Sequence, residues 1–292
     1  MQTVEKEKPQ RPSPPQRAEP REIIELRQLK EDQPDLGQAI DLQIQLLQLQ
    51  RRVQGRVPLP AINLDAAHIE KVLSDGKPML TFEQVPIDWS DLRFLVRSTA
   101  DAMRTHEAIE TDDYRRVEAL SRDADRLQPA MRDWYEAARP PVAGGRDVPE
   151  EIAGLEPLLL QAMRPFLSRC AEVLQQRSEL SMWTHAHCAL CAGEPDFAVI
   201  TPSADRHLIC SRCALRWKFA PLTCPYCRNS NRSRITSFAT TDGQYRVYAC
   251  DVCRRYLKAY DGRRATRPVM PMVDSVATLP LDAAAMQRGY SS

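Results

Sequence analysis

The chain has 292 residues, of which 40 are basic and 39 acidic, so its net charge of +1 favours neither nucleic acid nor anionic lipid as a partner. No apolar run reaches the length of a membrane span and no charged-then-apolar leader begins the chain, so we expect neither membrane insertion nor export. Eight of the nine cysteines form Cys-x-x-Cys pairs, the metal or redox pattern of a reducing compartment. The composition predicts a cytoplasmic protein.

Residues 1–20 combine prolines with charged residues and almost nothing apolar, which predicts a disordered tail. Residues 21–180 show helical periodicity, which predicts an α-helical domain. Pro129 is expected to open a short helix, and Pro165 to kink or split a later one. Helix stops are expected at Pro58, Pro60, Gly76, Pro78, Pro140, Pro141, Gly144 and Gly145. The apolar stripes are Leu42, Leu46, Leu49 and Val53; Leu92, Leu95, Val96 and Met103; Val117, Leu120, Ala124 and Leu127; and Leu158, Met163, Phe166, Cys170 and Val173.

This half shows no catalytic constellation. His68 and His106 stand alone on predicted helices, where a histidine is more often a surface or core residue than a catalytic one. Cys170 lies on an apolar stripe, so we interpret it as a buried, inert thiol.

The pattern changes after Trp183, where short strand-like runs such as 197–200 and 245–248 replace the helical stripes. Two residues between cysteines let a tight turn point both sulfurs at one ion, and a second such knuckle across a hairpin completes a tetrahedral site. The intervals between successive pairs are 18, 10 and 22 residues, and the two longer ones fit hairpins. The spacing therefore predicts two sites, formed by Cys188, Cys191, Cys210 and Cys213, and by Cys224, Cys227, Cys250 and Cys253.

Alternatives remain at this point. A cross-braced arrangement would join the first knuckle to the third. Four thiolates suit Zn²⁺ and also a single iron, so the ligands do not choose between these metals. A dithiol redox role is disfavoured because four pairs in series at hairpin spacing are rarely thioredoxin-like.

Side chains beside the knuckles are expected to support the sites. His185, His187 and His207 each precede a knuckle and are interpreted as flanking residues, since eight cysteines already satisfy two ions. Apolar and aromatic residues close to the knuckles are expected to pack over the sulfurs and exclude water. These are Leu215, Trp217, Tyr256 and Leu257.

The charge of the cysteine-rich half argues against a phosphate-binding face. Between Thr184 and Gly262 there are eleven basic and six acidic residues, and eight thiolates with two divalent ions bring the net charge down to about +1. Arg228, Arg232 and Arg234 are candidates for a small basic patch, as are Arg254 and Arg255, but ordinary solvated arginines are the favoured interpretation. A closed four-thiolate site also leaves no open position for catalysis.

The knuckles, their flanks and the end of the chain contain the runs Cys188-Ala-Leu-Cys191-Ala-Gly-Glu-Pro195, His207-Leu-Ile-Cys210-Ser-Arg-Cys213-Ala-Leu-Arg-Trp217, Cys224-Pro-Tyr-Cys227, Cys250-Asp-Val-Cys253-Arg-Arg-Tyr-Leu-Lys258, Leu281-Asp282 and Gly289-Tyr290. These runs resemble those of the FdhE formate dehydrogenase accessory proteins. The resemblance is strong over about residues 183–290, whereas the helical half agrees mainly in length, in its stripes and in its proline-rich start. This chain departs from the common knuckle, in which glycine follows the second cysteine. Its residues at that position are Ala192, Ala214, Arg228 and Arg254.

The resemblance implies an α+β protein in which a helical domain precedes two tandem rubredoxin-like or zinc-ribbon modules. It also implies a chaperone-like cytoplasmic maturation factor that is not an enzyme and has no small-molecule substrate. Such a factor binds the catalytic subunit of respiratory formate dehydrogenase before export, and its eight knuckle cysteines hold two iron or zinc ions. The predicted units are the tail 1–20, the helical domain 21–180, metal modules 181–222 and 223–265, and a C-terminal extension 266–292.

The competing hypothesis is a zinc-ribbon adaptor that binds nucleic acid or a transcription complex. The sequence also leaves open whether the chain forms a homo-oligomer and which surface contacts a client.

Overall fold

The computed structural model describes residues 19–137, 148–265 and 267–291. Nearly all of the predicted tail 1–20 and the predicted stops at Pro140, Pro141, Gly144 and Gly145 therefore lie outside the described residues. Within the described ranges, no helix is both long and apolar enough to cross a membrane.

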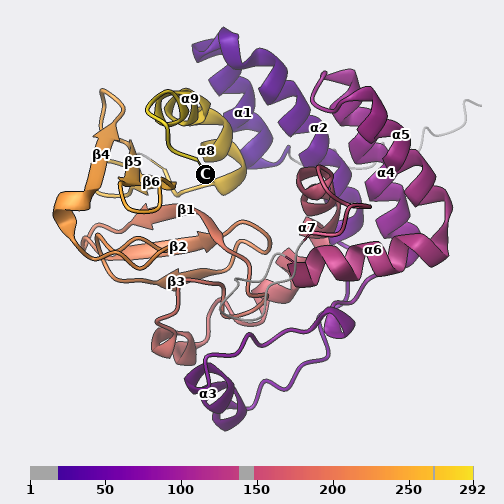
Figure 1. Cartoon of the computed structure of the whole chain (residues 1–292), viewed down its shortest axis with the longest axis horizontal. Helices are drawn as coiled ribbons and strands as arrows, with labels where there is room; N and C mark the ends of the chain where they lie inside the picture. Colours follow the sequence, from indigo (N-terminus) through magenta and orange to yellow (C-terminus); the bar gives the residue numbers. More distant parts are fainter. Residues whose placement is uncertain (1–18, 138–147, 266, 292) are drawn as a thin grey trace, which may run out of the picture.

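The predicted helical half is helical, and its described residues contain no strand. The leucine and valine stripes point into one hydrophobic core, as the periodicity predicts. Figure 1 shows most of these helices on one side of the molecule and the sheet on the other, with α3 set apart from both. The helices are α1 (Arg21–Asp32), α2 (Gly37–Gln54), α3 (Ala66–Ser74), α4 (Trp89–Thr105), α5 (Thr111–Arg122), α6 (Ala124–Ala137) and α7 (Glu156–Glu172).

Two local predictions in this half are wrong. The stripe from Val117 to Leu127 belongs to two helices, α5 and α6. The Asp123 side chain accepts hydrogen bonds from the backbone N–H groups of Asp125 and Arg126, so α6 starts at residue 124. Pro129 lies inside α6 and opens no helix of its own. The earlier start supplied by Asp123 explains both differences.

Pro165 neither splits nor ends α7, which runs through it. A proline inside a helix leaves the carbonyl four residues earlier without its N–H partner. That carbonyl belongs to Gln161, and the buried Gln50 side chain of α2 donates a hydrogen bond to it at 3.0 Å. The contact between α2 and α7 thus satisfies the acceptor that the proline leaves free.

Both cysteine modules contribute to one six-stranded sheet, with strand order β3-β2-β1-β6-β5-β4. The two modules join where β1 runs parallel to β6, with Phe197 opposite Lys258, whereas the other neighbours are antiparallel. β3 and β4 therefore form the two edges. The strands are β1 (Pro195–Ile200), β2 (Arg206–Cys210), β3 (Arg216–Lys218), β4 (Ile235–Ala239), β5 (Tyr245–Cys250) and β6 (Tyr256–Asp261).

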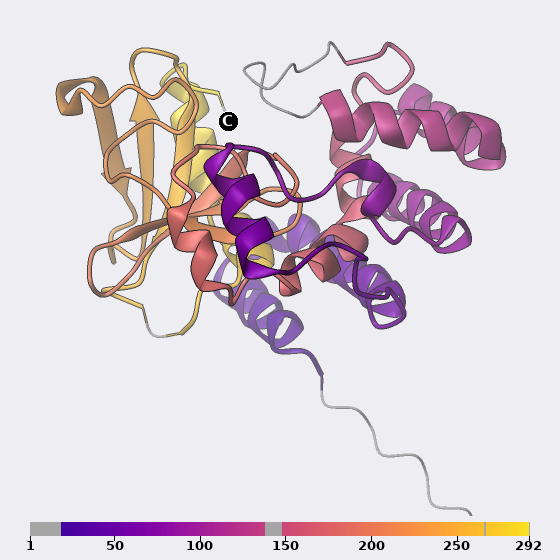
Figure 2. The same cartoon turned by 90° about the horizontal axis from the view of Figure 1, so that it is seen from below.

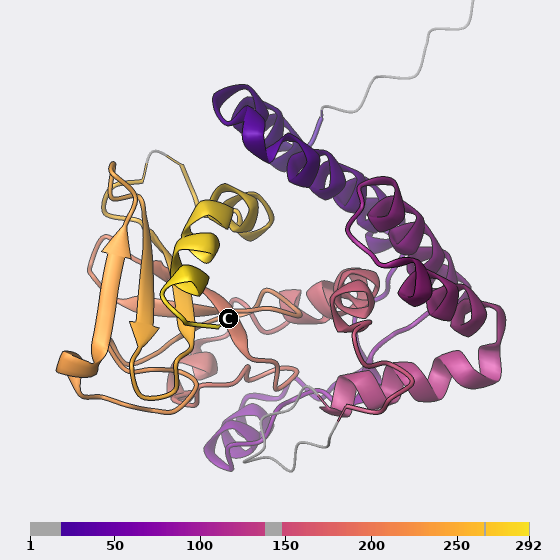
Figure 3. The ribbon, with the colours of Figure 1, turned by 45° about the horizontal axis from the view of Figure 1, so that its top comes forward.

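The C-terminal extension folds into two helices that connect the sheet to the helical half. α8 (Pro271–Ala277) packs Val273 and Val276 against α1 and α2. α9 (Leu279–Gln287) packs Leu281 and Ala285 against residues of β5 and β6. Figure 3 shows α8 and α9 between the sheet and the first two helices.

The hydrophobic core does not follow the predicted domain boundaries. One buried cluster runs from α2, α4 and α7 through Trp183 into the first cysteine module. α3 projects from the helices and lies beside residues 178–182, close to the sheet (Figure 2). The boundaries at residues 180, 222 and 265 remain predictions about units that share a core and a sheet.

Candidate metal centres

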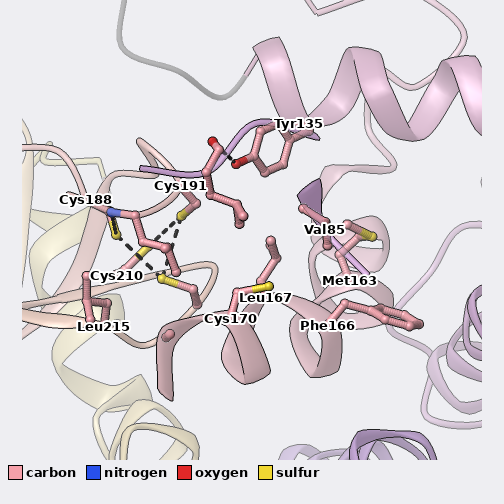
Figure 4. Packing of buried hydrophobic residues seen from close by; sticks show 14 of the residues in the cluster. Val85, Tyr135, Met163, Phe166, Leu167, Cys170, Cys188, Cys191, Cys210 and Leu215 are labelled. Atoms are coloured by element: carbon pink, nitrogen blue, oxygen red, sulfur yellow. Dashed lines mark hydrogen bonds between the residues drawn. The ribbon is translucent and has the colours of Figure 1, made fainter. Parts of the chain in front are cut away.

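The first cysteine group is closed and dry. Its four sulfurs lie within 4.8 Å of one another, and three of the Sγ–Sγ distances are 3.5, 3.5 and 3.7 Å. No member exposes more than 2% of its surface. Figure 4 shows the sulfurs pointing toward one another beside Leu215 and the α7 residues Leu167 and Cys170. The members are Cys188, Cys191, Cys210 and Cys213.

The second group has the same construction but lies at the surface. Its four sulfurs also lie within 4.8 Å of one another, with distances of 3.6 Å between Cys224 and Cys253 and between Cys227 and Cys250. Cys224 and Cys250 are buried, Cys253 is half-buried and Cys227 is exposed. The chain therefore brings the cysteines together in the sequential pairing that their spacing predicts, and not in the cross-braced alternative.

All four knuckles share one backbone turn. In each, the N–H of the residue after the second cysteine donates to the carbonyl of the first cysteine, at 2.9 to 3.1 Å. That residue has a φ of 60° or 61° in every knuckle, although none of the four is glycine. The missing glycines therefore leave the turn intact and introduce backbone strain instead. The four residues are Ala192, Ala214, Arg228 and Arg254.

The donor set fits a thiophilic divalent ion. Backbone N–H groups of Leu190 and Arg212 point at the sulfurs of Cys188 and Cys210, each at 3.4 Å, and such donors stabilise thiolates. Burial raises the pKa of the Cys188 thiol well above its usual value, so four deprotonated sulfurs in this place require a cation. Four sulfurs with no other donor atom in the group match zinc or iron.

Segments of the helical half hold the first group in place. The N–H groups of Met79 and Leu80 donate to the carbonyls of Ala189 and Leu190, the two residues inside the first knuckle, both at 2.9 Å. The Tyr135 hydroxyl of α6 in turn donates to the Leu80 carbonyl at 3.0 Å. The first knuckle is therefore hydrogen-bonded to the segment between α3 and α4.

Two arginines, one buried and one half-buried, bind the second knuckle of this group to the helices. Arg212, inside that knuckle, is 2% exposed and donates to the carbonyls of Trp134 and Tyr135 at 2.8 and 3.0 Å. Arg164 of α7 donates to the Ser211 carbonyl at 2.8 Å and contacts the Met272 sulfur. Sequence reasoning missed both residues, because nothing in the cysteine spacing reveals which arginines join the knuckle to the helices.

The histidines belong to neither group in the described residues. His185 and His187 pack around Trp183, with ring centroids 4.6 and 5.1 Å from the indole. Burial lowers the pKa of His187 to about 4. The Trp183 and Trp217 indoles donate to the carbonyls of His187 and His185, so these residues position the chain before the first knuckle.

Cys170 also stands apart from both groups. It is fully buried in the core, as its place on an apolar stripe predicts, and burial raises its pKa to about 12. Its thiol is therefore protonated at neutral pH, which fits a packing role.

No protein-family model matches the chain. An FdhE homologue from Aquifex aeolicus is 22% identical over 272 residues, which cover 90% of this chain and 88% of that protein. An FdhE homologue from Actinobacillus pleuropneumoniae serotype 3 is 24% identical over 283 residues, covering 91% and 84%. The crystal structure of the FdhE protein from Pseudomonas aeruginosa matches with a TM-score of 0.62 and 22% identity, over 92% of this chain and 91% of that one. The resemblance to the FdhE family is confirmed.

The similarity to the FdhE homologues is not confined to the knuckles. An FdhE homologue from Shewanella oneidensis is 32% identical over 109 residues, or 36% of this chain. The longer matches extend into the helical half, where the sequence showed only similar length and stripes. The FdhE crystal structure supports the same α+β architecture over the 92% of this chain that it covers.

Proposed function

We propose that this chain is a metal-binding accessory factor for the maturation of respiratory formate dehydrogenase, acting in the cytoplasm on the catalytic subunit before export. The observation that carries this proposal is the presence of two four-cysteine groups in a chain that matches FdhE homologues over nine tenths of its length. The formate dehydrogenase role follows from the resemblance to the FdhE accessory proteins.

The eight knuckle cysteines would hold two ions, either iron or zinc. A bound ion would cross-link two knuckles and, if it is iron, would add a centre able to change oxidation state. In the first module, the cross-link would fix the loop whose Arg212 binds the carbonyls of α6. Metal binding at this site would therefore stabilise the contact between sheet and helices as well as the module itself.

The geometry favours a binding protein over an enzyme. A four-cysteine site provides no vacant coordination position for water or substrate. The first group is also sealed from solvent, so no substrate can reach it. What such a centre offers is a rigid platform whose surface contacts another macromolecule.

One observation keeps the nucleic-acid adaptor as a second candidate. Arg228, Arg232 and Arg234 are all exposed, and none has an ion-pair partner among residues 19–137, 148–265 and 267–291. Such arginines can contact phosphate groups. A steep fall of nucleic-acid affinity with salt would support this candidate.

The test uses a strain that lacks its own accessory factor and a tagged copy of this chain. The wild type should restore formate dehydrogenase activity and co-purify with the catalytic subunit. Cys188→Ser with Cys191→Ser should lose both, together with metal from the first group, because two remaining thiolates do not retain the ion. Cys170→Ala is the matched control, since it removes a buried thiol outside both groups.

Two results would contradict the proposal. One is wild-type formate dehydrogenase activity from the double cysteine variant, with the variant protein present and depleted of metal. The other is the absence of the catalytic subunit from purified wild-type complexes under conditions in which the chain restores activity.

A further inference from the structure

One edge of the sheet is open and the other is protected. Edge strands attract further strands, and proteins commonly protect them with charges, proline, bulges or short length. β3 has three residues, two of them the charged Arg216 and Lys218. β4 has five residues without charge, proline or a register shift, and it is the outermost strand in Figure 1.

The backbone register shows which groups of β4 face outward. Asp251 N–H donates to the Arg234 carbonyl, and Thr240 N–H donates to the Tyr245 carbonyl. In an antiparallel pair, bonded positions alternate, so residues 234, 236, 238 and 240 bond to β5. The N–H and C=O groups of Ser237 and Ala239 therefore point away from the sheet. These groups have no hydrogen-bond partner in the part of the chain that the structure describes.

Two arginines directly precede this edge strand. Arg232 and Arg234 are exposed, and their side chains make no hydrogen bond or ion pair with the described residues. The acidic residue opposite Arg234 is Asp251, whose carboxylate accepts bonds from the Thr236 and Tyr290 hydroxyls and pairs with Arg254. Asp242, the next acidic residue along the chain, accepts bonds from the Thr240 hydroxyl and the Gln244 N–H. The two arginines thus make the beginning of the edge basic, and neither forms an ion pair with the described residues.

We propose that β4 binds an extended, acidic segment of a partner protein as a seventh strand of the sheet. The outward N–H and C=O groups match a peptide backbone, which a nucleic acid does not offer. The added strand runs antiparallel to β4, so its C-terminal end lies beside Arg232 and Arg234 and carries its acidic residues there. This surface rests on the proposed accessory role, for which it supplies a client-binding site.

The probe is a fluorescein-labelled ten-residue peptide of alternating Thr and Val with three Asp at its C-terminal end. Its isomer with the three Asp at the N-terminal end is the orientation control. Binding to the purified full-length, metal-loaded chain is measured by fluorescence anisotropy at several salt concentrations. The first peptide should bind more tightly than the isomer, and its affinity should fall as salt rises.

Four variants locate the binding. Ser237→Pro removes an outward N–H and leaves the β5 ladder intact, so it should weaken peptide binding about tenfold, whereas Ser237→Ala should not. Arg232→Glu with Arg234→Glu should weaken it by about tenfold or more. Arg97→Glu, at an exposed position of α4, is the charge control and should bind as the wild type does. Circular dichroism and metal content confirm that each variant is folded.

Several outcomes would overturn the proposal. Equal binding by Ser237→Pro and the wild type would exclude the edge. Tighter binding of a fluorescein-labelled twelve-nucleotide single strand, unaffected by Ser237→Pro, would assign the arginines to nucleic acid. A dimer in sedimentation that Ser237→Pro converts to a monomer would assign the edge to a second copy. Intact peptide binding without co-purification of the catalytic subunit would instead contradict the proposed function and leave this surface in place.

Discussion

Arg212 allows the contact between the first metal module and the helical half to be tested separately from the metal. Its guanidinium donates to the carbonyls of Trp134 and Tyr135, in the last turn of α6, and lies over the Trp134 ring at 4.2 Å. Carbonyls at a helix C-terminus lack partners within the helix and attract cations. Replacing Arg212 with alanine removes both hydrogen bonds and the contact with the Trp134 ring.

The expected loss of stability is large for a single side chain, because Arg212 is buried. Each hydrogen bond from a charged donor contributes about 1.5–3 kcal/mol, and a desolvated cation–π contact about 2 kcal/mol. Relief of the desolvation of Arg212 offsets part of this sum. We therefore expect Arg212→Ala to lower the free energy of unfolding by about 3–5 kcal/mol. Arg212→Lys keeps the charge but loses the planar guanidinium that donates to both carbonyls. Its free energy of unfolding should therefore lie between those of the wild type and Arg212→Ala.

The assay is urea unfolding of metal-loaded protein, followed by circular dichroism, with metal content measured on the same samples. The N–H that points at the Cys210 sulfur belongs to the backbone of residue 212, so alanine retains it and the metal content should not change. A loss below about 1 kcal/mol would show that the contact is of little energetic importance. Loss of the ion together with the stability would show that Arg212 acts through the knuckle.

Three further predictions follow from the site and its surroundings. In a chelator challenge the second ion should leave first, and iodoacetamide should label the exposed Cys227 before the buried cysteines; one common release rate would contradict this. Ala214→Gly should raise the free energy of unfolding by up to about 1 kcal/mol, because φ is 60° there; a clear loss in urea titrations would refute the strain. Ion pairing with Arg263 lowers the pKa of Asp261 to about 2, so this carboxylate stabilises the fold above pH 4, and that contribution is lost as the pH falls through 2. Asp261→Asn should flatten the dependence of the free energy of unfolding on pH between 4 and 2. The same pH dependence in the variant as in the wild type would contradict this role of Asp261.

The helices and the cysteine grouping could be predicted because both depend on short-range patterns. A stripe such as Leu46, Leu49 and Val53 encodes which face of α2 is buried, whatever lies opposite it. The 18- and 22-residue intervals likewise fix which knuckles a hairpin can bring together. The break at Asp123 was missed because an N-cap residue interrupts a helix without interrupting its apolar stripe.

The long-range arrangement could not be predicted in this way. The parallel pairing of β1 with β6 joins segments about sixty residues apart and leaves no mark in either strand. The roles of Arg212 and Gln50 depend on carbonyls that only the folded chain places beside them. The difference in exposure between the two cysteine groups also arises from packing, since their knuckle sequences are alike.

Elemental analysis tests the central claim most directly. Protein purified without chelator or oxidant should contain close to two ions of iron or zinc per chain, and the paired replacement of Cys224 and Cys227 by serine should reduce this to one. The iron form should show the thiolate-to-metal charge-transfer colour when oxidised. About one ion or none in the wild type, or two ions in the paired variant, would contradict two independent four-cysteine centres.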